Sequence, residues 1–473
     1  MGHVPGRTVF NGPIVIIGFG GIGQGFLPLL FRHIDLPGRD VTVVSADDRG
    51  RGIAEEMGVR FIQQALDADN LRQTLAHLLQ GRSGFIVNLS VNVSSAALVS
   101  LAREWGALYI DTCIEPWAGG YTDPAASPAQ RSNYALREEA IMLAGQYGKG
   151  PTALLAHGAN PGLVSHFVKR ALLHIARDTG VAATASEEQT DWALLAQKLG
   201  IKGIHIAERD TQRSACPKEQ MTFVNTWSVD GFISEGLQPA ELGWGTHEKF
   251  LPQGGHHHDF GCKAAIWLDR PGAVVRVRTW TPCEGPFFGF LITHNESISL
   301  ADYLTVHDGD RVVYRPTCHY AYHPCDAAVL SLHELAGKGW DAPQVPVQIV
   351  DDIQDGHDEL GVLLFGHQKN AYWYGSRLDI ATARGLAPFQ NATGLQVTAA
   401  VLAGVVWAIE NPDAGILEAE ALPHEDILSL AQPYLGVVEG VYTSWTPLNG
   451  RSRFFDECLD RDDPWQFRNV IVS

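Results

Sequence analysis

Residues 12–23 read GPIVIIGFGGIG and indicate a nucleotide-binding fold. The branched apolar run 14–17 predicts a buried strand, and the apolar residues after the glycines predict a helix. Gly18, Gly20 and Gly23 fit the pattern G-x-G-x-x-G. In that motif the first glycine makes the turn, the second lets the backbone approach a pyrophosphate, and the third lets helix and strand pack closely. A chain with 49 glycines can hold this pattern by chance, but the strand before it and the helix after it favour a dinucleotide site.

Length and charge restrict the class of protein. A chain of 473 residues is too long for one ordinary core, so two domains are expected. The formal net charge of -18 argues against nucleic acid or an anionic membrane as a partner and is compatible with a cationic small-molecule substrate. Seven cysteines without a C-x-x-C pair favour a reducing compartment. The longest apolar run, 399–409, is shorter than the roughly 18 residues of a membrane span, so a cytoplasmic protein is expected.

Short apolar runs alternate with helical patterns over the first third of the chain, as in a parallel sheet with crossover helices. We expect strands at 14–17, 41–44, 85–89, 108–110 and 153–156 and helices at 70–79, 94–105 and 134–147. The second strand is followed by SADDR, residues 45–49. Asp47 there is a candidate ligand for the ribose of NAD, whereas Ser45 with nearby Arg49 is compatible with NADP.

The pattern changes after this region, where irregular stretches and many aromatic residues begin. Strand-like runs at 273–281 and 289–293 indicate a mixed α/β domain. The apolar segment 394–410 predicts a helix that packs back on the first domain. The expected division is a Rossmann-like domain over 1–156, a mixed α/β substrate domain over 157–390, and a C-terminal segment, 411–473, that completes the second domain.

Polar residues held among apolar ones mark candidate site segments. The first, IDTCIEPW at 110–117, follows the fourth predicted strand. The carboxyl ends of parallel strands form the ligand side of an open sheet, so Glu115 is expected to face the cofactor crevice, with a surface acid as the alternative. The second, GANPG at 158–162, sets Asn160 in a turn, where its amide either contacts a ligand or simply suits the turn, and the residues favour the turn.

A third segment, IHIAERDTQ at 204–212, starts with strand-like alternation and continues into a charged turn. Glu208 is either a site residue or half of a local ion pair with Arg209, and Asp210 with Arg213 would form a second such pair.

Two further segments combine a ring with carboxylates. Trp227 and Glu235 lie in NTWSVDGFISE and would together suit a cationic ligand, because a ring face attracts positive charge and a carboxylate pairs with it. A lone tryptophan is more often a core residue. His294 precedes Glu296 in THNES, and a histidine near a carboxylate is a candidate proton carrier, with a structural histidine as the alternative.

Two histidine-rich segments look like metal sites but do not predict one. The first is HHHD at 256–259, followed by Cys262, and the second is CHYAYHPC at 318–325. Neither has a second ligand pair at zinc-site spacing, and adjacent histidines do not easily converge on one ion. No metal is therefore expected.

Many segments together resemble bacterial homospermidine synthases, a family similar in fold to the saccharopine dehydrogenases. The segments are GFGGIGQG, NLSVNVSS, LYIDTCIEPW, GANPGLVS, KGIHIAERDTQR, FVNTWSVDGFISEGLQPAELGWGT, LITHNESIS, YRPTCHYAYHPC, KNAYWYGS, NATGLQV and DPWQFRNV. The likeness runs from Gly12 to the C-terminus. It implies an α/β fold with a Rossmann-like dinucleotide-binding domain and a second mixed α/β substrate and dimerisation domain. It also implies a homodimer with NAD, which is reduced and reoxidised within one catalytic cycle.

The resemblance also implies the residues of the site. Trp227 would hold a cationic intermediate by its ring face, with Glu235 near the outer ammonium group. Glu208 and Asn160 would anchor the inner end of the substrate, and Glu115 would lie near the reacting amine. The other residues assigned to the substrate are His294, Glu296 and Asn92. Those assigned to the dinucleotide are Gly18, Gly20, Gly21, Ile22, Gly23, Ser45, Asn88, Ser90, Asp111, Thr112 and Asn160.

The chain departs from the family pattern at two of these positions. Asn92 stands where the family has an aspartate, which removes a negative charge from the expected pocket wall. Ser45 also stands where the family has an aspartate, so the expected ribose contact changes.

The implied reaction joins two putrescines, or putrescine and spermidine, through an imine and releases ammonia or diaminopropane. A base has to hold the proton of the first amine, and His294 and Glu115 are the candidates. The alternative is a saccharopine-type or carboxyspermidine-type amino-acid dehydrogenase, which would need arginine or lysine forks for substrate carboxylates, whereas these motifs are rich in acids. A non-enzymatic NAD-binding protein would not need the polar segments to converge.

Overall fold

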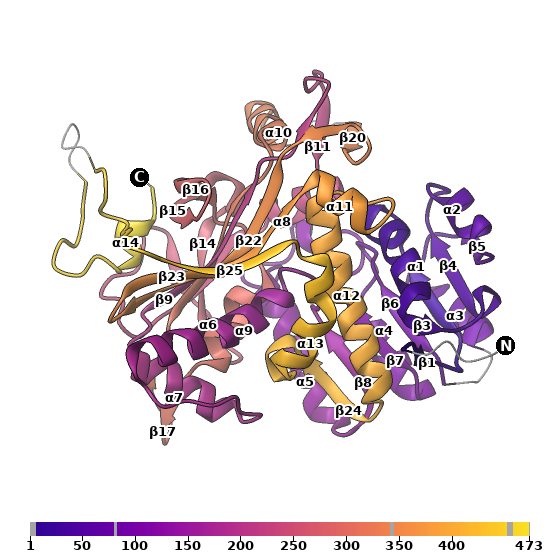
Figure 1. Cartoon of the computed structure of the whole chain (residues 1–473), viewed down its shortest axis with the longest axis horizontal. Coiled ribbons are helices and arrows are strands. Elements are labelled where there is room, and N and C mark those ends of the chain that lie inside the picture. Colours follow the sequence, from indigo (N-terminus) through magenta and orange to yellow (C-terminus); the bar gives the residue numbers. More distant parts are fainter. Residues whose placement is uncertain (1–5, 80–82, 341–344, 452–456, 473) are drawn as a thin grey trace.

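Two large β-sheets form the protein, one parallel and one mixed. A computed structural model describes residues 6–79, 83–340, 345–451 and 457–472. In Figure 1 the parallel sheet lies on the right, with the indigo N-terminal part of the chain, and the mixed sheet lies on the left.

The parallel sheet has seven strands in the order β24-β8-β7-β6-β2-β4-β5. Its strands are β2 (Ile14–Ile17), β4 (Val41–Ser45), β5 (Arg60–Gln63), β6 (Phe85–Asn88), β7 (Leu108–Asp111), β8 (Gly150–Leu155) and β24 (Ala414–Glu418). The helices around it are α1 (Gly21–His33), α2 (Arg51–Glu56), α3 (Leu71–Leu79), α4 (Ser95–Trp105), α5 (Asn133–Tyr147) and α12 (Ala392–Glu410). Ile14 and Ile16 share a core with α1 and α12, whereas Val15 and Ile17 share one with α3 and α4. Helices therefore cover both faces, which is why the strands are continuously apolar.

All the strands and helices that the sequence predicts in this half are present in the structure. Ser94 caps α4 by accepting a hydrogen bond from the N–H of Ala97. Two strands were missed: β5 is a partly exposed edge strand, and β24 comes from the distant C-terminal part of the chain. The segment 411–473 adds β25 (Val437–Thr443) to the mixed sheet, as expected of a segment that completes the second domain, but it also adds β24 to the parallel sheet, which was not expected.

The mixed sheet has ten strands, eight of them in the order β13-β14-β12-β19-β9-β22-β23-β25, with the hairpin β15–β16 attached through β19. They are β9 (Gly203–Asp210), β12 (Pro239–Gly243), β13 (Gly255–His257), β14 (Ala265–Pro271), β15 (Arg276–Thr281), β16 (Gly285–Phe290), β19 (Thr317–His323), β22 (His357–His367), β23 (Asn370–Asp379) and β25 (Val437–Thr443). The remaining helices are α6 (Leu163–Thr179), α7 (Gln189–Leu199), α8 (Val229–Leu237), α9 (Asn295–Tyr303), α10 (Asp326–Gly337), α11 (Ile380–Leu386), α13 (His424–Ala431) and α14 (Phe467–Val470).

Short elements complete the described chain. Four two-stranded sheets pair β1 (Thr8–Val9) with β3 (Ile34–Asp35), β10 (Arg213–Ser214) with β21 (Ile353–Asp355), β11 (Thr222–Asn225) with β20 (Val345–Gln348), and β17 (Val306–Asp308) with β18 (Arg311–Tyr314). Single 3-10 turns lie at Gly38–Asp40, Gly120–Thr122, Gly272–Val274, Ala419–Ala421 and Gln432–Tyr434.

Two strands predicted in the second domain have different bounds. The run at 273–281 becomes a strand only from Arg276, because a 3-10 turn precedes it. The run at 289–293 is the end of β16, which stops at Phe290. Leu291 and Ile292 are fully buried, which gave the run its strand-like appearance, but they connect the hairpin to α9 outside regular structure.

Helix α12 joins the two halves. It packs against α1 and β7 on one side and against β22 and β23 on the other. By length and composition it is the one helix in the described residues that could cross a membrane, yet 89% of its apolar window is buried inside the protein. Asn391 caps it and also donates hydrogen bonds to the carbonyls of Thr226 and Ile349, at 2.6 and 3.0 Å.

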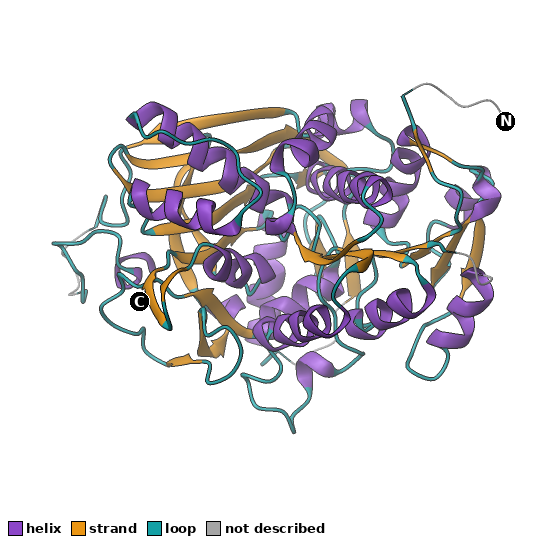
Figure 2. Ribbon diagram, turned by 90° about the horizontal axis from the view of Figure 1, so that it is seen from below, coloured by secondary structure: helices purple, strands orange, loops and turns teal. Residues whose placement is uncertain are grey.

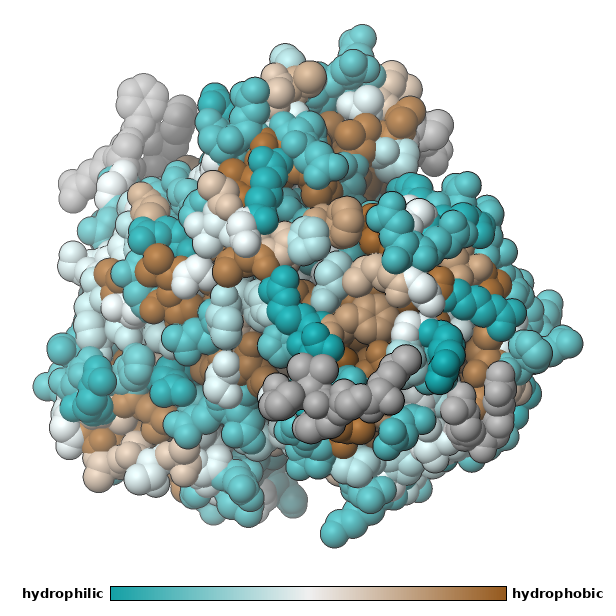
Figure 3. All heavy atoms as spheres, turned by 45° about the vertical axis from the view of Figure 1, so that its right-hand side comes forward, coloured by the Kyte–Doolittle hydropathy of each residue, from teal (hydrophilic) through white to brown (hydrophobic). Residues whose placement is uncertain are grey.

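Most helices flank the strands (Figure 2), and hydrophilic residues cover most of one face of the molecule (Figure 3). Figure 2 shows purple helices on both sides of the orange strands. Hydrophilic residues cover most of the face drawn in Figure 3, and the hydrophobic residues among them form small patches. Most of the buried centre is apolar, and buried polar residues occur both at the cavity and away from it, as at Glu241 and Glu359.

Candidate active site

A cavity of about 500 Å³ separates the carboxyl ends of the parallel strands from the mixed sheet. The predicted residues in its wall are Gly18, Gly20, Gly21, Ile22, Gly23, Ser45, Ser90, Asn92, Thr112, Glu115, Asn160, Glu208, Trp227, Glu235 and His294. Asn88, Asp111 and Glu296 do not reach the cavity and are buried behind its wall. The polar segments singled out in the sequence therefore converge, which disfavours a protein that only binds a nucleotide.

The glycine turn between β2 and α1 has the form of a phosphate cradle. Gly18 has a φ of +85°, and a Cβ there would lie 2.7 Å from the carbonyl oxygen of Leu89. A Cβ on Gly23 would lie 2.8 Å from the carbonyl oxygen of Gly18, so this glycine lets helix and strand approach. Gly20 faces open space and caps α1 without a side chain, so the N–H groups of the first helical turn remain available to an anion. These residues fit a dinucleotide pyrophosphate.

Asn88 and Asp111, which were predicted to contact the cofactor, lie behind the cavity wall and hold its loops in place instead. Asn88 accepts hydrogen bonds from the hydroxyl of Ser90 at 2.6 Å and from its N–H at 3.3 Å. Asp111 accepts from the hydroxyl of Tyr109 at 2.7 Å and from the N–H of Ala156 at 2.6 Å. Burial raises the pKa of Asp111 to about 6, although these donors oppose the shift. Asn88 therefore fixes the loop that follows β6, and Asp111 fixes the start of the loop that follows β8.

At the end of β4, the candidate ribose residues are already paired. Asp47 accepts two hydrogen bonds from the guanidinium of Arg49, at 2.9 and 2.7 Å, and both side chains are largely exposed. Ser45 is buried and lines the cavity.

Glu115 lies in the loop after β7 and is 6% exposed. Its Oε2 accepts a hydrogen bond from the N–H of Asn92 at 3.2 Å, and Asn92 takes a left-handed φ of 65°. Burial raises the pKa of Glu115 to about 8. The N–H of Asn92 opposes this shift, and the nearby charge of Glu235 adds to it. This carboxyl group therefore exchanges its proton near neutral pH.

Glu208, on β9, lies between two hydrogen-bond donors. Its Oε2 accepts from the amide of Asn160 at 2.7 Å and from the hydroxyl of Tyr320 at 2.5 Å. Burial raises the pKa of Glu208 to about 7 despite these donors. The pKa of Asp358 also rises well above its ordinary value through burial and the charges of Glu208 and Asp210. A group of buried carboxyls thus lies beneath one end of the cavity.

Neither local ion pair considered for this segment is present. Arg209 pairs with Asp326 at 3.3 Å, and Arg213 pairs with Asp355 at 2.6 Å. The strand runs to Asp210, so the expected charged turn starts later than the sequence suggested.

His294 lies between two carboxylates. Its Nε2 is 3.0 Å from Glu235 and its Nδ1 is 3.3 Å from Glu296. Burial favours the neutral ring, but the charges of Glu296 and Glu235 outweigh it and raise the pKa of His294 to about 10. Glu296 was predicted to touch the substrate, but it is 1% exposed and does not line the cavity. It contacts His294 on the side away from the cavity.

Trp227 follows β11 and lines the cavity before α8 begins. Its indole N–H donates to the hydroxyl of Tyr322 at 2.9 Å, and its ring lies 5.3 Å from that of Phe232. Ser228 caps α8 by accepting a hydrogen bond from the N–H of Gly231 at 3.1 Å. The ring is thus held in place and is part of the cavity wall rather than of the core alone.

Sequence reasoning missed Tyr320, Gln348 and Thr393, which also line the cavity. Tyr320 lies inside the segment 318–325 that looked like half of a zinc site, and its strand position, β19, was not predicted. Gln348 approaches the glycine turn so closely that a Cβ on Gly21 would lie 2.3 Å from its amide nitrogen. The other histidine-rich segment has structural contacts: His258 lies 3.2 Å from Glu241 and stacks on Tyr134.

Comparisons with known proteins agree with this architecture. A family model described as Saccharopine dehydrogenase NADP binding domain matches residues 14–154, and one described as Saccharopine dehydrogenase C-terminal domain matches residues 158–441. The homospermidine synthase of Blastochloris viridis is 58% identical over 98% of both chains. That of Mesorhizobium japonicum is 54% identical over 98% of this chain and 96% of its own.

A solved structure is similar over the whole length. The homospermidine synthase of Legionella pneumophila, crystallised in complex with NAD, is 46% identical and covers 99% of each chain with a TM-score of 0.92. Likeness of this extent leaves no large part of the chain unmatched. The chain belongs to the homospermidine synthase family and has the two-domain saccharopine dehydrogenase architecture.

Proposed function

We propose that this protein is an NAD-dependent homospermidine synthase that joins two putrescines and releases ammonia, or uses spermidine as donor and releases diaminopropane. The observation that carries the proposal is one cavity with a glycine cradle at one end and buried carboxyls at the other. The first suits a pyrophosphate and the second suits a diamine with a positive charge at each end.

The cradle formed by Gly18, Gly20 and Gly23, with Ser45, Ser90 and Thr112 beside it, would hold NAD. When bound, NAD supplies a hydride acceptor for an amine carbon and returns the hydride to the later imine, so the whole cycle is redox-neutral. The name of the matched domain refers to NADP, whereas the Legionella pneumophila structure holds NAD. We assign NAD because Arg49, the basic residue beside the ribose position, is already paired with Asp47.

Glu115 is the better candidate for the proton transfers. Hydride loss requires a neutral amine, so a base must accept a proton from the ammonium group. The pKa of Glu115, raised to about 8 by burial, suits exchange near neutral pH, whereas the two carboxylates beside His294 raise its pKa to about 10 despite burial and keep that ring protonated. His294 then orients Glu235 and Glu296 instead of acting as the base.

The other carboxyls anchor the ends of the substrate. Glu208 with Asn160 would bind the inner ammonium group, and Glu235 would bind the outer one. These contacts fix the position of the diamine along the cavity, so the reacting carbon is held where hydride transfer can occur. A partly enclosed site also limits the access of water, which would hydrolyse the imine.

Trp227 would face the iminium carbon. An indole face attracts positive charge without donating a proton or forming an ion pair that the charge must later leave. The hydrogen bond to Tyr322 holds that face toward the cavity. Asn92, which replaces a charged side chain of the family pattern, would lower the negative charge near Glu115.

An amino-acid dehydrogenase is the weaker candidate. Such an enzyme needs basic side chains for the substrate carboxylate. Among the described residues of the cavity wall, Arg49 is the one arginine or lysine, and it is bound to Asp47. We also propose a cytoplasmic homodimer, on the basis of the family resemblance and of the free cysteines at 113, 216, 262, 283, 318, 325 and 458.

The test is incubation of purified protein with putrescine and a catalytic amount of NAD, followed by mass spectrometry for homospermidine and an assay for ammonia. Product in excess of NAD is expected, with equal amounts of homospermidine and ammonia. Stoichiometric accumulation of NADH without homospermidine would instead identify a plain amine dehydrogenase, and the absence of both would reject the proposal.

A further inference from the structure

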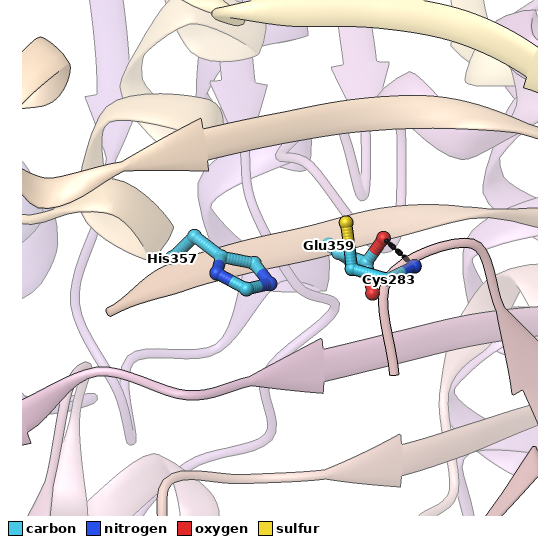
Figure 4. Close-up of side chains that lie close together, drawn as sticks. All are labelled: Cys283, His357 and Glu359. Atoms are coloured by element: carbon cyan, nitrogen blue, oxygen red, sulfur yellow. Dashed lines mark hydrogen bonds between the residues drawn. The ribbon is translucent and has the colours of Figure 1, made fainter. Parts of the chain in front are cut away.

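Cys283, His357 and Glu359 lie together on a face of the mixed sheet that the active site does not use. His357 and Glu359 are two residues apart on β22, so their side chains share one face of the strand. Asp358, between them, points to the opposite face and bonds to Thr393 at the cavity. Cys283 lies in the turn between β15 and β16 and reaches the same place from a neighbouring hairpin. Figure 4 shows the three side chains directed toward one another.

We propose that these three residues bind one divalent metal ion of the zinc type. A thiolate, an imidazole and a carboxylate are ligands that zinc takes, and three protein ligands with a water in the fourth position form a known type of site. Among the described residues, this is the one group whose ligand atoms all lie within 4.8 Å of one another. Bonds of about 2.0–2.3 Å would bring tetrahedral ligands to roughly 3.3–3.8 Å apart, so the exposed Cys283 side chain has to move by about 1 Å.

The histidine is oriented for a ligand. The hydroxyl of Thr211 lies 3.3 Å from Nδ1 of His357 and also donates to the carbonyl of the same residue at 2.9 Å. Nε2 is left buried, without a hydrogen-bond partner among the described residues. A buried polar atom without a partner is costly, and metal-bound histidines usually have their second nitrogen held in this way. The ring is therefore fixed with its free nitrogen toward Cys283 and Glu359.

The carboxylate is held as firmly. Glu359 is fully buried and accepts hydrogen bonds from the hydroxyl of Thr281 at 2.7 Å, from the N–H of Cys283 at 2.9 Å and from the N–H of Glu284 at 3.3 Å. Oε2 accepts two of these bonds, whereas Oε1 accepts only the N–H of Cys283 and keeps a lone pair for an ion. Because Cys283 is exposed, an ion can reach the three ligands from solvent.

The guanidinium of Arg377 places a positive charge next to Cys283, and a bound metal ion would take the place of that charge. Its Nη1 lies 2.8 Å from the sulfur of Cys283, and its Nη2 lies 3.6 Å from Glu439. Burial raises the pKa of the Cys283 thiol, and the hydrogen bond from Arg377 opposes that rise. On binding, the thiol proton is released to solvent, the sulfur–metal bond forms, and Arg377 shifts toward Glu439. The ion would then tie the β15–β16 hairpin to β22.

The test is a titration of the full-length protein with Co²⁺, whose thiolate bond gives a charge-transfer absorption band. One equivalent is expected to produce the band, and Zn²⁺ is expected to remove it by competition. Cys283→Ser should abolish the band, whereas Cys216→Ser, which changes an exposed thiol outside the cluster, should leave it intact. No band in the unchanged protein, or an equal band in Cys283→Ser, would overturn the proposal.

Two further variants distinguish a metal site from a reactive thiol. His357→Gln should weaken Co²⁺ binding at least tenfold, because it removes a ligand. Arg377→Ala should strengthen it several-fold, because it removes a competing cation, and this surface variant remains informative if His357→Gln does not fold. Zn²⁺ should raise the melting temperature of the unchanged protein but not that of Cys283→Ser. Weaker binding in Arg377→Ala, or an equal melting shift in Cys283→Ser, would count against the site.

Discussion

The two ends of the cavity are suited to opposite charges by different means. The parallel-sheet end uses backbone N–H groups at the start of α1, where glycines leave room for an anion. The mixed-sheet end uses side chains, since Glu208 and Glu235 come from β9 and α8. Backbone donors do not titrate, so the first end keeps its affinity over a wide pH range. The second end gains or loses charge with pH and with its ligand.

The mixed-sheet end, with Glu115, Glu208 and Glu235, is called the acidic end below. The protonation of its carboxyls differs between the empty cavity and the cavity with substrate. Burial raises the pKa of Glu115 to about 8 and that of Glu208 to about 7, so at pH 7, with no cation near, Glu115 is mostly protonated and Glu208 is about half protonated. A diamine that enters would favour the ionised forms and drive protons out. With these pKa values the empty cavity would hold fewer buried negative charges than the cavity with a diamine bound.

The largest effect is expected from Glu115→Gln, which keeps the size of the side chain but removes the proton acceptor. Turnover should fall by about 10²- to 10⁴-fold, the range that a positioned acid or base contributes. Steady-state product formation measures it. NAD affinity should stay unchanged, because the cradle does not use this residue. Glu139→Gln, an exposed carboxyl on α5, is the matched control and should keep full activity. A loss of less than threefold in Glu115→Gln would assign the proton transfers elsewhere.

A pair of glycine variants separates the fold from the cofactor at the other end. Gly18→Ala adds a Cβ at a φ of +85°, 2.7 Å from a backbone oxygen, and should destabilise the protein by about 2 kcal/mol or more. Gly20→Ala has an extended φ of -71° and open space around it, so its melting temperature should not change.

Both variants should nevertheless bind NAD more weakly, by about tenfold or more, since a methyl group at Gly20 fills the space where the backbone approaches a phosphate. Fluorescence titration and thermal melts measure the two properties separately. Unchanged NAD affinity in Gly20→Ala would mean that the pyrophosphate lies elsewhere.

The two ends of the cavity also differ in how far the sequence predicts them. The glycine cradle is local, because one strand, one turn and one helix follow each other within a short segment, so its pattern is legible in the chain. Glu115 was accessible through the rule that ligands bind at the carboxyl ends of parallel strands, whereas the residues around Asn160 favoured a plain turn. Asn88 and Asp111 end strands too, yet they bond to the loops instead of facing the cavity. Strand ends identify the right region but not which way each side chain points.

The acidic end depends on contacts between distant residues. Tyr320 bonds to Glu208 across 112 positions of sequence, and His294 bonds to Glu235 across 59. No local pattern encodes such pairs, so Tyr320 and Asp358 were not predicted. The other side chains of this end became firm candidates only through the likeness to a known family. The same limit applies to Glu359 and Cys283, which are 76 positions apart.

The loss of turnover expected from changes to the ring of Trp227 is smaller than that expected from Glu115→Gln. Trp227→Ala should lower turnover by roughly thirtyfold, the rate equivalent of a desolvated cation–π contact of about 2 kcal/mol. Trp227→Phe keeps an aromatic face and should lose much less. Tyr322→Phe keeps the indole but removes the hydrogen bond that orients it, so its loss should lie between the two. Single-turnover rates with saturating diamine measure the series, and equal losses in Trp227→Ala and Trp227→Phe would exclude the ring-face role.

The smallest effect is the pH dependence of stability, and its sign follows from the acidic end. The folded protein holds protons on Glu115 and Glu208 up to about pH 8 and 7, whereas unfolded glutamate releases them near its ordinary value of 4.5. Their stabilisation is complete below that value and is lost as pH rises through 7 to 8. His294 acts in the same direction, because its pKa is raised from 6.5 to about 10. The melting temperature of the ligand-free protein should therefore fall by a few degrees between pH 6 and 9.

Glu208→Gln should flatten that fall, because one titrating group is removed, while Gly20→Ala should leave it unchanged. Putrescine should stabilise the unchanged protein more at pH 9 than at pH 6, and its binding near pH 7 should release on the order of one proton. Calorimetry in two buffers of different ionisation enthalpy measures that release. If the melting temperature instead rose with pH, or if diamine binding took up protons, the carboxyls at this end would already be ionised in the empty cavity, and the charge contrast between its two ends would be permanent rather than induced by the ligand.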